Sequence, residues 1–123
     1  YGHDAGDAVL RTLAQTFRQT LREVDIVGRM GGEEFAACMP QTDLESALRA
    51  AERLRKAVSQ AGVAINGAET LYVTISIGAT LGHPRPDSKI PRVETLLDEA
   101  DRALYGSKSE GRNTVTFSRR PAA

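Results

Sequence analysis

The chain has 123 residues, which suits a single domain that can bury a hydrophobic core. Its 16 basic and 16 acidic side chains cancel, which argues against nucleic acid or an anionic membrane as the main partner but allows a local nucleotide pocket. Cys38 is the only cysteine, which excludes an internal disulfide, and no apolar run approaches the ~20 residues of a membrane span. We therefore expect a cytoplasmic domain without membrane contact of its own, with Cys38 buried on a strand; a membrane anchor elsewhere in the parent protein stays open.

Apolar side chains at three- and four-residue spacing predict three amphipathic helices. The first opens at Asp7, and its apolar stripe consists of Leu10, Leu13, Ala14, Phe17 and Leu21. The second follows Thr42 and Glu45, which have the spacing of a capping box, and its stripe consists of Leu44, Ala47, Leu48, Ala51, Leu54 and Val58. The third has a stripe formed by Val93, Leu96, Leu97, Ala100, Ala103 and Leu104.

Short β-prone segments predict strands between these helices. The expected strands are a first hairpin of residues 26–30 and 35–39, a second of 63–65 and 71–80, and a last strand at 115–117. Residues 82–91, with three prolines, are expected to form a loop, and 118–123 a flexible tail after a domain that spans 1–117. The order predicts an α+β sandwich in which helices flank a central, mostly antiparallel sheet.

Two glycines and two carboxylates stand together between the strands of the first predicted hairpin. Gly31 and Gly32 suit a tight turn and leave backbone open to a ligand. Glu33 and Glu34 offer the hard oxygen ligands that Mg²⁺ prefers. Taken alone, such a segment is more often an ordinary surface turn, so the residues leave both interpretations open.

The surrounding segments resemble one family. Arg22 and Asp25 lie upstream, with five residues between Asp25 and Gly31. Further matches are Tyr1-Gly2-His3 with Gly6-Asp7, the run Thr74-Ile75-Ser76-Ile77-Gly78, and Ala100-Asp101 through Tyr105, Lys108, Gly111, Arg112 and Asn113. In this order and spacing the chain resembles the GGDEF family of bacterial diguanylate cyclases from Tyr1 to about Phe117, with Glu in place of Asp as the third motif letter. The resemblance implies a nucleotidyl-cyclase-like fold.

It also implies an enzyme that condenses two GTP molecules into cyclic di-GMP (c-di-GMP) and pyrophosphate, as a homodimer with Mg²⁺ or Mn²⁺. By this resemblance Glu33 binds the metal, and Glu34 binds metal or activates the attacking 3′-hydroxyl. Substrate contacts fall on Asp7, which reads guanine, on the backbone of Gly31 and Gly32, and on the phosphate-binding Lys108 and Arg112. The alternatives are a first-turn or N-cap role for Asp7 and a helix-dipole role for the two cations.

The resemblance further places an inhibitory c-di-GMP site at Arg22 and Asp25. Arg53 matches an arginine that completes this site in relatives, from the same or a neighbouring domain. An Arg fork can hold guanine O6 and N7, and Asp can accept from the N–H groups of a base. The alternative is an exposed local ion pair that contributes little.

Tyr1 follows the strand, metal-binding Asp and phosphate-holding turn with which family members begin. We therefore expect a cyclase parent and a 123-residue chain with little or no cyclase activity that still binds c-di-GMP. The alternatives are a catalytically silent c-di-GMP receptor and a dimerisation domain without a ligand.

Overall fold

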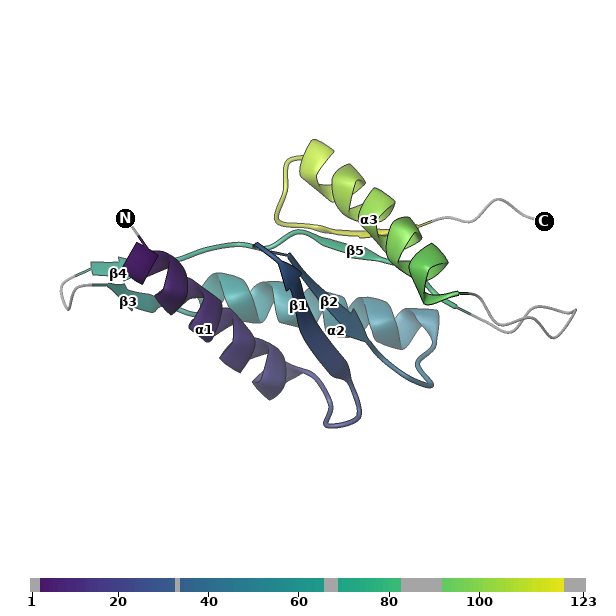
Figure 1. Cartoon of the computed structure of the whole chain (residues 1–123), viewed down its shortest axis with the longest axis horizontal. Coiled ribbons are helices and arrows are strands. Elements are labelled where there is room, and N and C mark those ends of the chain that lie inside the picture. Colours follow the sequence, from purple (N-terminus) through teal and green to yellow (C-terminus); the bar gives the residue numbers. More distant parts are fainter. Residues whose placement is uncertain (1–2, 33, 66–68, 83–91, 119–123) are drawn as a thin grey trace, which may run out of the picture. The chain divides into compact units, whose positions relative to one another are not determined.

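The structure is a computed structural model that describes residues 3–32, 34–65, 69–82 and 92–118 (Figure 1). The chain divides into two compact units, Tyr1–Thr74 and Ile75–Ala123, and each is treated separately below. The first contains α1 (His3–Thr20), β1 (Ile26–Gly31), β2 (Glu34–Cys38), α2 (Leu44–Gln60), β3 (Val63–Ile65) and β4 (Glu69–Leu71). The second contains β5 (Ile77–Ala79), α3 (Val93–Ser109) and β6 (Val115–Phe117).

Helix α1 begins at His3, so the predicted start at Asp7 is wrong. The apolar stripe continues upstream through Ala5, which is buried against Val63 and Ile65 of β3. That packing extends the helix by a turn, and it moves Asp7 into the helix interior as an exposed side chain. Asp7 is therefore neither an N-cap nor a first-turn acid.

The core of the first unit lies where α1 packs on α2 and on the β3–β4 pair. Val63 pairs with Leu71 across this antiparallel pair, which confirms a short second hairpin. At its other end α1 contacts β2, because the rings of Phe17 and Phe35 meet edge to face with centroids 5.1 Å apart. These contacts fix the last turn of α1 beside the β1–β2 hairpin.

The β1–β2 hairpin is antiparallel, with Ile26 opposite Cys38 and Gly31 opposite Glu34. β1 extends one residue further than predicted, to Gly31, which lies beside an irregularity in the pairing, and Gly32 follows at φ +53°. β2 begins one residue earlier than predicted, at Glu34, and ends at Cys38. Cys38 is exposed, so its predicted burial is wrong. It shares a face with Ile26, which is 67% exposed, while Phe35 packs on α1 from the other face.

Helix α2 confirms the second predicted helix but not its cap. The N-cap is Asp43, whose carboxylate accepts a hydrogen bond from the Ser46 N–H at 2.8 Å. The predicted capping box of Thr42 and Glu45 is therefore wrong, and the Thr42 hydroxyl bonds elsewhere.

The predicted long strand 71–80 is divided in the structure. Its first residue ends β4, and Ile77–Ala79 forms β5, which pairs with β6 in parallel. A parallel pair needs a crossover, and α3 supplies it between the two strands. The residues of β6 and the third helix agree with the sequence prediction.

In the second unit, α3 packs directly on β5 and β6. A Cβ on Gly78 would lie 2.1 Å from the Leu104 nitrogen and 2.2 Å from the Ala100 carbonyl oxygen, so helix and strand meet backbone to backbone. The fully buried Ser107 hydroxyl bonds both the Ile77 carbonyl and Thr116. The Ser118 N–H donates to the Ala79 carbonyl at 2.8 Å, so this residue of the predicted tail is bonded to β5.

The α+β class is confirmed. The strands of the described segments pair as three two-stranded sheets, two antiparallel and one parallel, where a central sheet was predicted. Much of the predicted loop 82–91 and of the tail lies outside the described residues. Within the described segments, no helix combines the length and apolar character that crossing a bilayer requires.

Candidate functional site

Arg22 and Asp25 close a tight turn between α1 and β1. The Asp25 N–H donates to the Arg22 carbonyl at 3.0 Å, and the Arg22 N–H donates to Asp25 Oδ2 at 2.8 Å. A turn of this kind brings residues i and i+3 within about 7 Å, so the predicted spacing places both side chains at one point. The sequence prediction that Arg22 and Asp25 act together is consistent with this geometry.

The two side chains form a bidentate ion pair. Arg22 Nη2 lies 2.9 Å from Asp25 Oδ1, and Nε lies 3.4 Å from Oδ2. The Asp25 side chain is only 2% exposed, whereas that of Arg22 is 51% exposed. Hydrogen bonds from the guanidinium lower the pKa of the Asp25 carboxyl below its ordinary value, which outweighs the opposing effect of desolvation.

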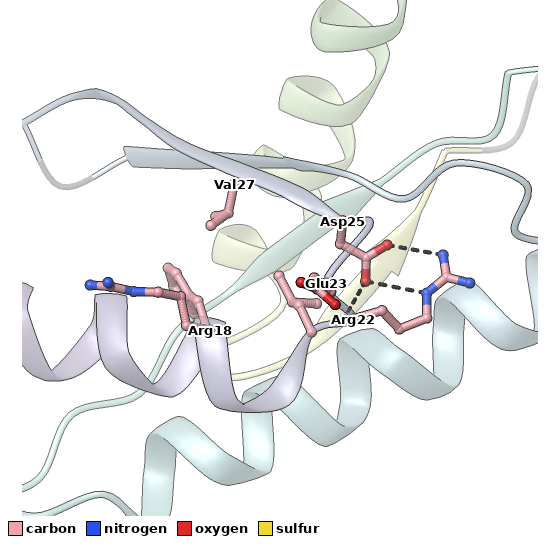
Figure 2. A pocket seen from close by; sticks show the side chains of 7 residues that line it. Arg18, Arg22, Glu23, Asp25 and Val27 are labelled. Carbon is pink, nitrogen blue, oxygen red and sulfur yellow. Dashed lines mark hydrogen bonds and ion pairs between the residues drawn. The ribbon is translucent and has the colours of Figure 1, made fainter.

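A pocket of about 390 Å³ lies beside this pair (Figure 2). Apolar side chains and two charges of each sign form its walls. They come from the last turn of α1, the turn that follows it and the start of β1: Phe17, Arg18, Leu21, Arg22, Glu23, Asp25 and Val27. Figure 2 shows Arg22 and Asp25 facing each other, while the guanidinium of Arg18 points away from them. The mixture of apolar surface and paired charge suits a planar, polar-edged ligand such as a nucleobase.

Arg22 also reaches the loop between β2 and α2. Its Nη2 donates to the Thr42 hydroxyl at 2.7 Å and to the Pro40 carbonyl at 3.1 Å, and the Thr42 hydroxyl donates to the same carbonyl at 3.0 Å. These contacts of Arg22 were not predicted from the sequence. The sequence indicated only a capping role for Thr42, because its spacing to Glu45 fits a local capping pattern. No sequence pattern indicates its contact with Arg22, which lies 20 positions away.

Arg53 is not brought to the pair by any described contact. It is exposed on α2 and does not line the pocket. Among the described residues, no hydrogen bond or ion pair joins it to Arg22 or Asp25. Its predicted part in the inhibitory site stays a prediction.

The glycine-rich hairpin tip lies at the opposite end of β1 from this pocket. Arg29 Nε donates to the Gly32 carbonyl at 2.8 Å, and this hydrogen bond ties Gly32 to strand β1. Glu34 opens β2 with an exposed side chain, and Glu33 lies outside the described residues. Within the part of the chain that is described, no group of three or more His, Cys, Asp and Glu side chains could hold a metal ion.

The remaining predicted substrate residues fall in both units. Asp7 is exposed on α1 in the first unit. Lys108 is exposed in the last turn of α3, and Arg112 follows the helix with φ +65°. A Schellman-type end positions Arg112: Gly111 has φ +106°, and the Arg112 N–H donates to the Ser107 carbonyl at 3.0 Å.

Comparison with known proteins agrees with the resemblance. The sequence model described as "Diguanylate cyclase, GGDEF domain" matches residues 1–114. The chain is 44% identical over 116 residues to the response regulator PleD of Caulobacter vibrioides, covering 94% of this chain and 25% of PleD. It therefore spans about a quarter of that relative's length.

Solved structures similar to this chain include the following two. One is the diguanylate cyclase SiaD of Pseudomonas aeruginosa in complex with its activator SiaC, with 40% identity, a TM-score of 0.85, and coverage of 95% of this chain and 43% of that one. The other is the GGDEF domain of DgcB from Caulobacter crescentus in complex with c-di-GMP, with 30% identity, a TM-score of 0.84, and coverage of 96% and 67%. From the family match over residues 1–114, together with this fold, the chain belongs to the GGDEF domain family of diguanylate cyclases.

Proposed function

We propose that this chain is part of a diguanylate cyclase that joins two GTP molecules into c-di-GMP, and that its Arg22–Asp25 pocket binds c-di-GMP as an inhibitory site. The observation that carries the second part is the Arg22–Asp25 ion pair at a pocket of about 390 Å³. This pocket lies at the end of β1 remote from Gly31. Product bound there would regulate the cyclase through a site distinct from the hairpin tip.

For catalysis we assign the roles that the family resemblance implies. Glu33 and Glu34 would hold Mg²⁺ or Mn²⁺, which in phosphoryl transfer neutralises charge on the phosphates. The exposed carboxylate of Glu34 has the hard oxygen chemistry that such an ion needs. Asp7 would read guanine, and Lys108 with Arg112 would contact phosphates. Two cyclase domains would face each other as a homodimer, each with one GTP.

For inhibition, Arg22 and Asp25 supply complementary groups for guanine. The guanidinium is a fork of donors that matches the O6 and N7 acceptors, and the carboxylate can accept from N1–H and the exocyclic amine. Phe17, Leu21 and Val27 add apolar surface along the pocket, against which a base can pack. The similarity to a GGDEF domain solved with c-di-GMP supports this choice of ligand.

Calorimetry of the 123-residue chain with c-di-GMP tests the inhibitory site. We expect binding by the wild type and a loss of about 10- to 100-fold for Arg22→Ala, because a bidentate contact to guanine contributes roughly 1–3 kcal/mol. Arg49→Ala is the matched control, since Arg49 is an exposed α2 arginine paired with Glu45 at 3.3 Å and should leave affinity unchanged. Equal affinities for wild type and Arg22→Ala would reject this site.

The alternative is a catalytically silent c-di-GMP receptor, which would bind its ligand through the same Arg22–Asp25 pair. Turnover of GTP with Mg²⁺ separates the two functions. Our expectation is little or no turnover by the 123-residue chain and turnover by the full-length parent. A parent that binds c-di-GMP without consuming GTP would be a receptor.

A further inference from the structure

We propose that the loop Pro40–Thr42 is an intramolecular competitor for Arg22, and that c-di-GMP binds this pocket only after displacing it. Thr42 would then set the affinity of the site, although it is not one of the pocket-lining residues. The inference rests on the proposed function of the same pocket. It adds a regulatory element that no motif in the sequence marks.

The N–H groups of the Arg22 guanidinium are divided between Asp25 and the loop. A guanidinium has five N–H groups: one on Nε and two on each Nη. In the structure Nε and one N–H of Nη2 serve Asp25, so the remaining Nη2 N–H is directed to Thr42 and Pro40. Nη1 has no partner among the described residues. Guanine O6 and N7 accept hydrogen bonds from two parallel N–H donors. The Nη1 and Nη2 groups of Arg22 can donate to both atoms only if Nη2 breaks its hydrogen bonds to the loop.

Asp25 is occupied in the same way. Oδ1 accepts from Arg22 Nη2, and Oδ2 accepts from both Nε and the backbone N–H of Arg22. With 2% of its side chain exposed, Asp25 presents almost no surface to a second ligand. A base that bonds to this carboxylate must therefore also move the Arg22 side chain, which lies over it and is 51% exposed.

The competing loop is held in an unusual backbone conformation. Gln41 has φ +50°, which is uncommon for a residue other than glycine. Pro40 and Thr42, which flank Gln41, are joined by a hydrogen bond from the Thr42 hydroxyl to the Pro40 carbonyl, and the same hydroxyl accepts a hydrogen bond from Arg22. The next residue, Asp43, caps α2 through Ser46. Release of Arg22 from the loop would therefore change the environment of the residues that begin α2.

Substitution of Thr42 tests the competition in the 123-residue chain by calorimetry with c-di-GMP. Thr42→Val keeps the shape but removes the acceptor, and we expect affinity to increase about two- to fivefold, since the Pro40 carbonyl remains. Thr42→Ser keeps the acceptor and should behave as wild type, and Thr42→Ala should tighten binding as Thr42→Val does. Thr12→Val is the matched control, because its hydroxyl bonds a carbonyl within α1 at 3.0 Å.

The double variant Arg22→Ala/Thr42→Val distinguishes competition from a general packing effect, because it should bind no better than Arg22→Ala. Amide NMR gives a second readout: c-di-GMP should shift the Ser46 resonance in the wild type and not in Arg22→Ala. Unchanged or weaker affinity in both Thr42→Val and Thr42→Ala, with Arg22→Ala still impaired, would overturn the competitor and leave the inhibitory site standing. No binding by the wild type, or equal binding by Arg22→Ala, would overturn both proposals.

Discussion

Asp25 is a residue whose protonation should change the stability of the first unit. Its pKa is lowered in the folded chain, chiefly by hydrogen bonds from the Arg22 guanidinium. The unfolded chain therefore takes up a proton at a higher pH than the folded chain does. The stability that this pair contributes is full above the ordinary carboxyl pKa of about 4 and is lost as pH falls through the lower, folded value.

We therefore expect Asp25→Asn to melt at a lower temperature than wild type at pH 7, with the difference shrinking steadily below about pH 4. Thermal unfolding between pH 7 and pH 2.5, followed by circular dichroism, measures it. Asp98→Asn is the control for removing an exposed carboxylate, because Asp98 lies on the surface of α3 away from any described ion pair. A constant difference between Asp25→Asn and wild type at every pH would show that the ion pair does not control this stability.

At the scale of elements, β5 and α3 meet so closely at Gly78 that no side chain fits between them. A methyl group at Gly78 would meet the Leu104 nitrogen and the Ala100 carbonyl at distances no Cβ tolerates, and both are backbone atoms that cannot move aside. We expect Gly78→Ala to destabilise the chain by about 3 kcal/mol or more. Gly106, within α3, would place its Cβ 3.6 Å from Thr116, which is ordinary contact.

Gly106→Ala is accordingly the matched control for Gly78→Ala. It should be neutral or stabilising by roughly 0.5–1 kcal/mol, because alanine restricts the unfolded chain and favours the helix. Urea unfolding of both variants gives the two free energies. Equal stability of Gly78→Ala and wild type would mean that α3 and β5 are not packed backbone to backbone.

The elements also show what the sequence could predict. The spacing of apolar residues predicted which faces of α2 and α3 pack against the protein, because these stripes repeat every three or four residues within each helix. The spacing did not predict the start of α1, because Ala5 is buried in a cluster with Val63 and Ile65 of β3, which lie far away in the sequence. The break between β4 and β5 escaped prediction for a similar reason: the residues of 71–80 favour a strand throughout, and the partner β6 lies more than 30 residues downstream.

For the molecule as a whole, the sequence predicted the contacts of the site between residues close together in the chain better than those between distant residues. The family resemblance singled out Arg22 and Asp25, and a local ion pair between them was the alternative interpretation; both lie within one turn, where the structure describes their contact. The contact of Arg22 with Thr42 depends on how the hairpin returns the chain to the start of α2. Asp7 and the two cations of the α3 end lie in different compact units, so their common substrate was indicated by family resemblance alone.

The charge balance of the whole molecule leads to a prediction about salt. With 16 charges of each sign overall, and two of each at the pocket, no strong field attracts an anionic ligand from a distance. Binding of c-di-GMP should therefore depend on recognition of its bases. We expect its Kd to rise less than about fivefold between 50 and 300 mM NaCl, whereas a protein that contacts many phosphates loses roughly 10³–10⁵ in affinity between 50 and 200 mM.

Competition against excess yeast RNA extends this test. RNA should leave c-di-GMP bound, because a polyanion gains nothing from a surface of balanced charge, and the Arg22 fork reads a base edge at close range. The same titration with cyclic di-AMP should show at least tenfold weaker binding, since adenine has an amino group where guanine has the O6 acceptor. Displacement by RNA, or a salt dependence of two or more decades, would instead place the binding energy in the phosphates, and the Arg22–Asp25 pair would then act as a charged patch rather than as a guanine site.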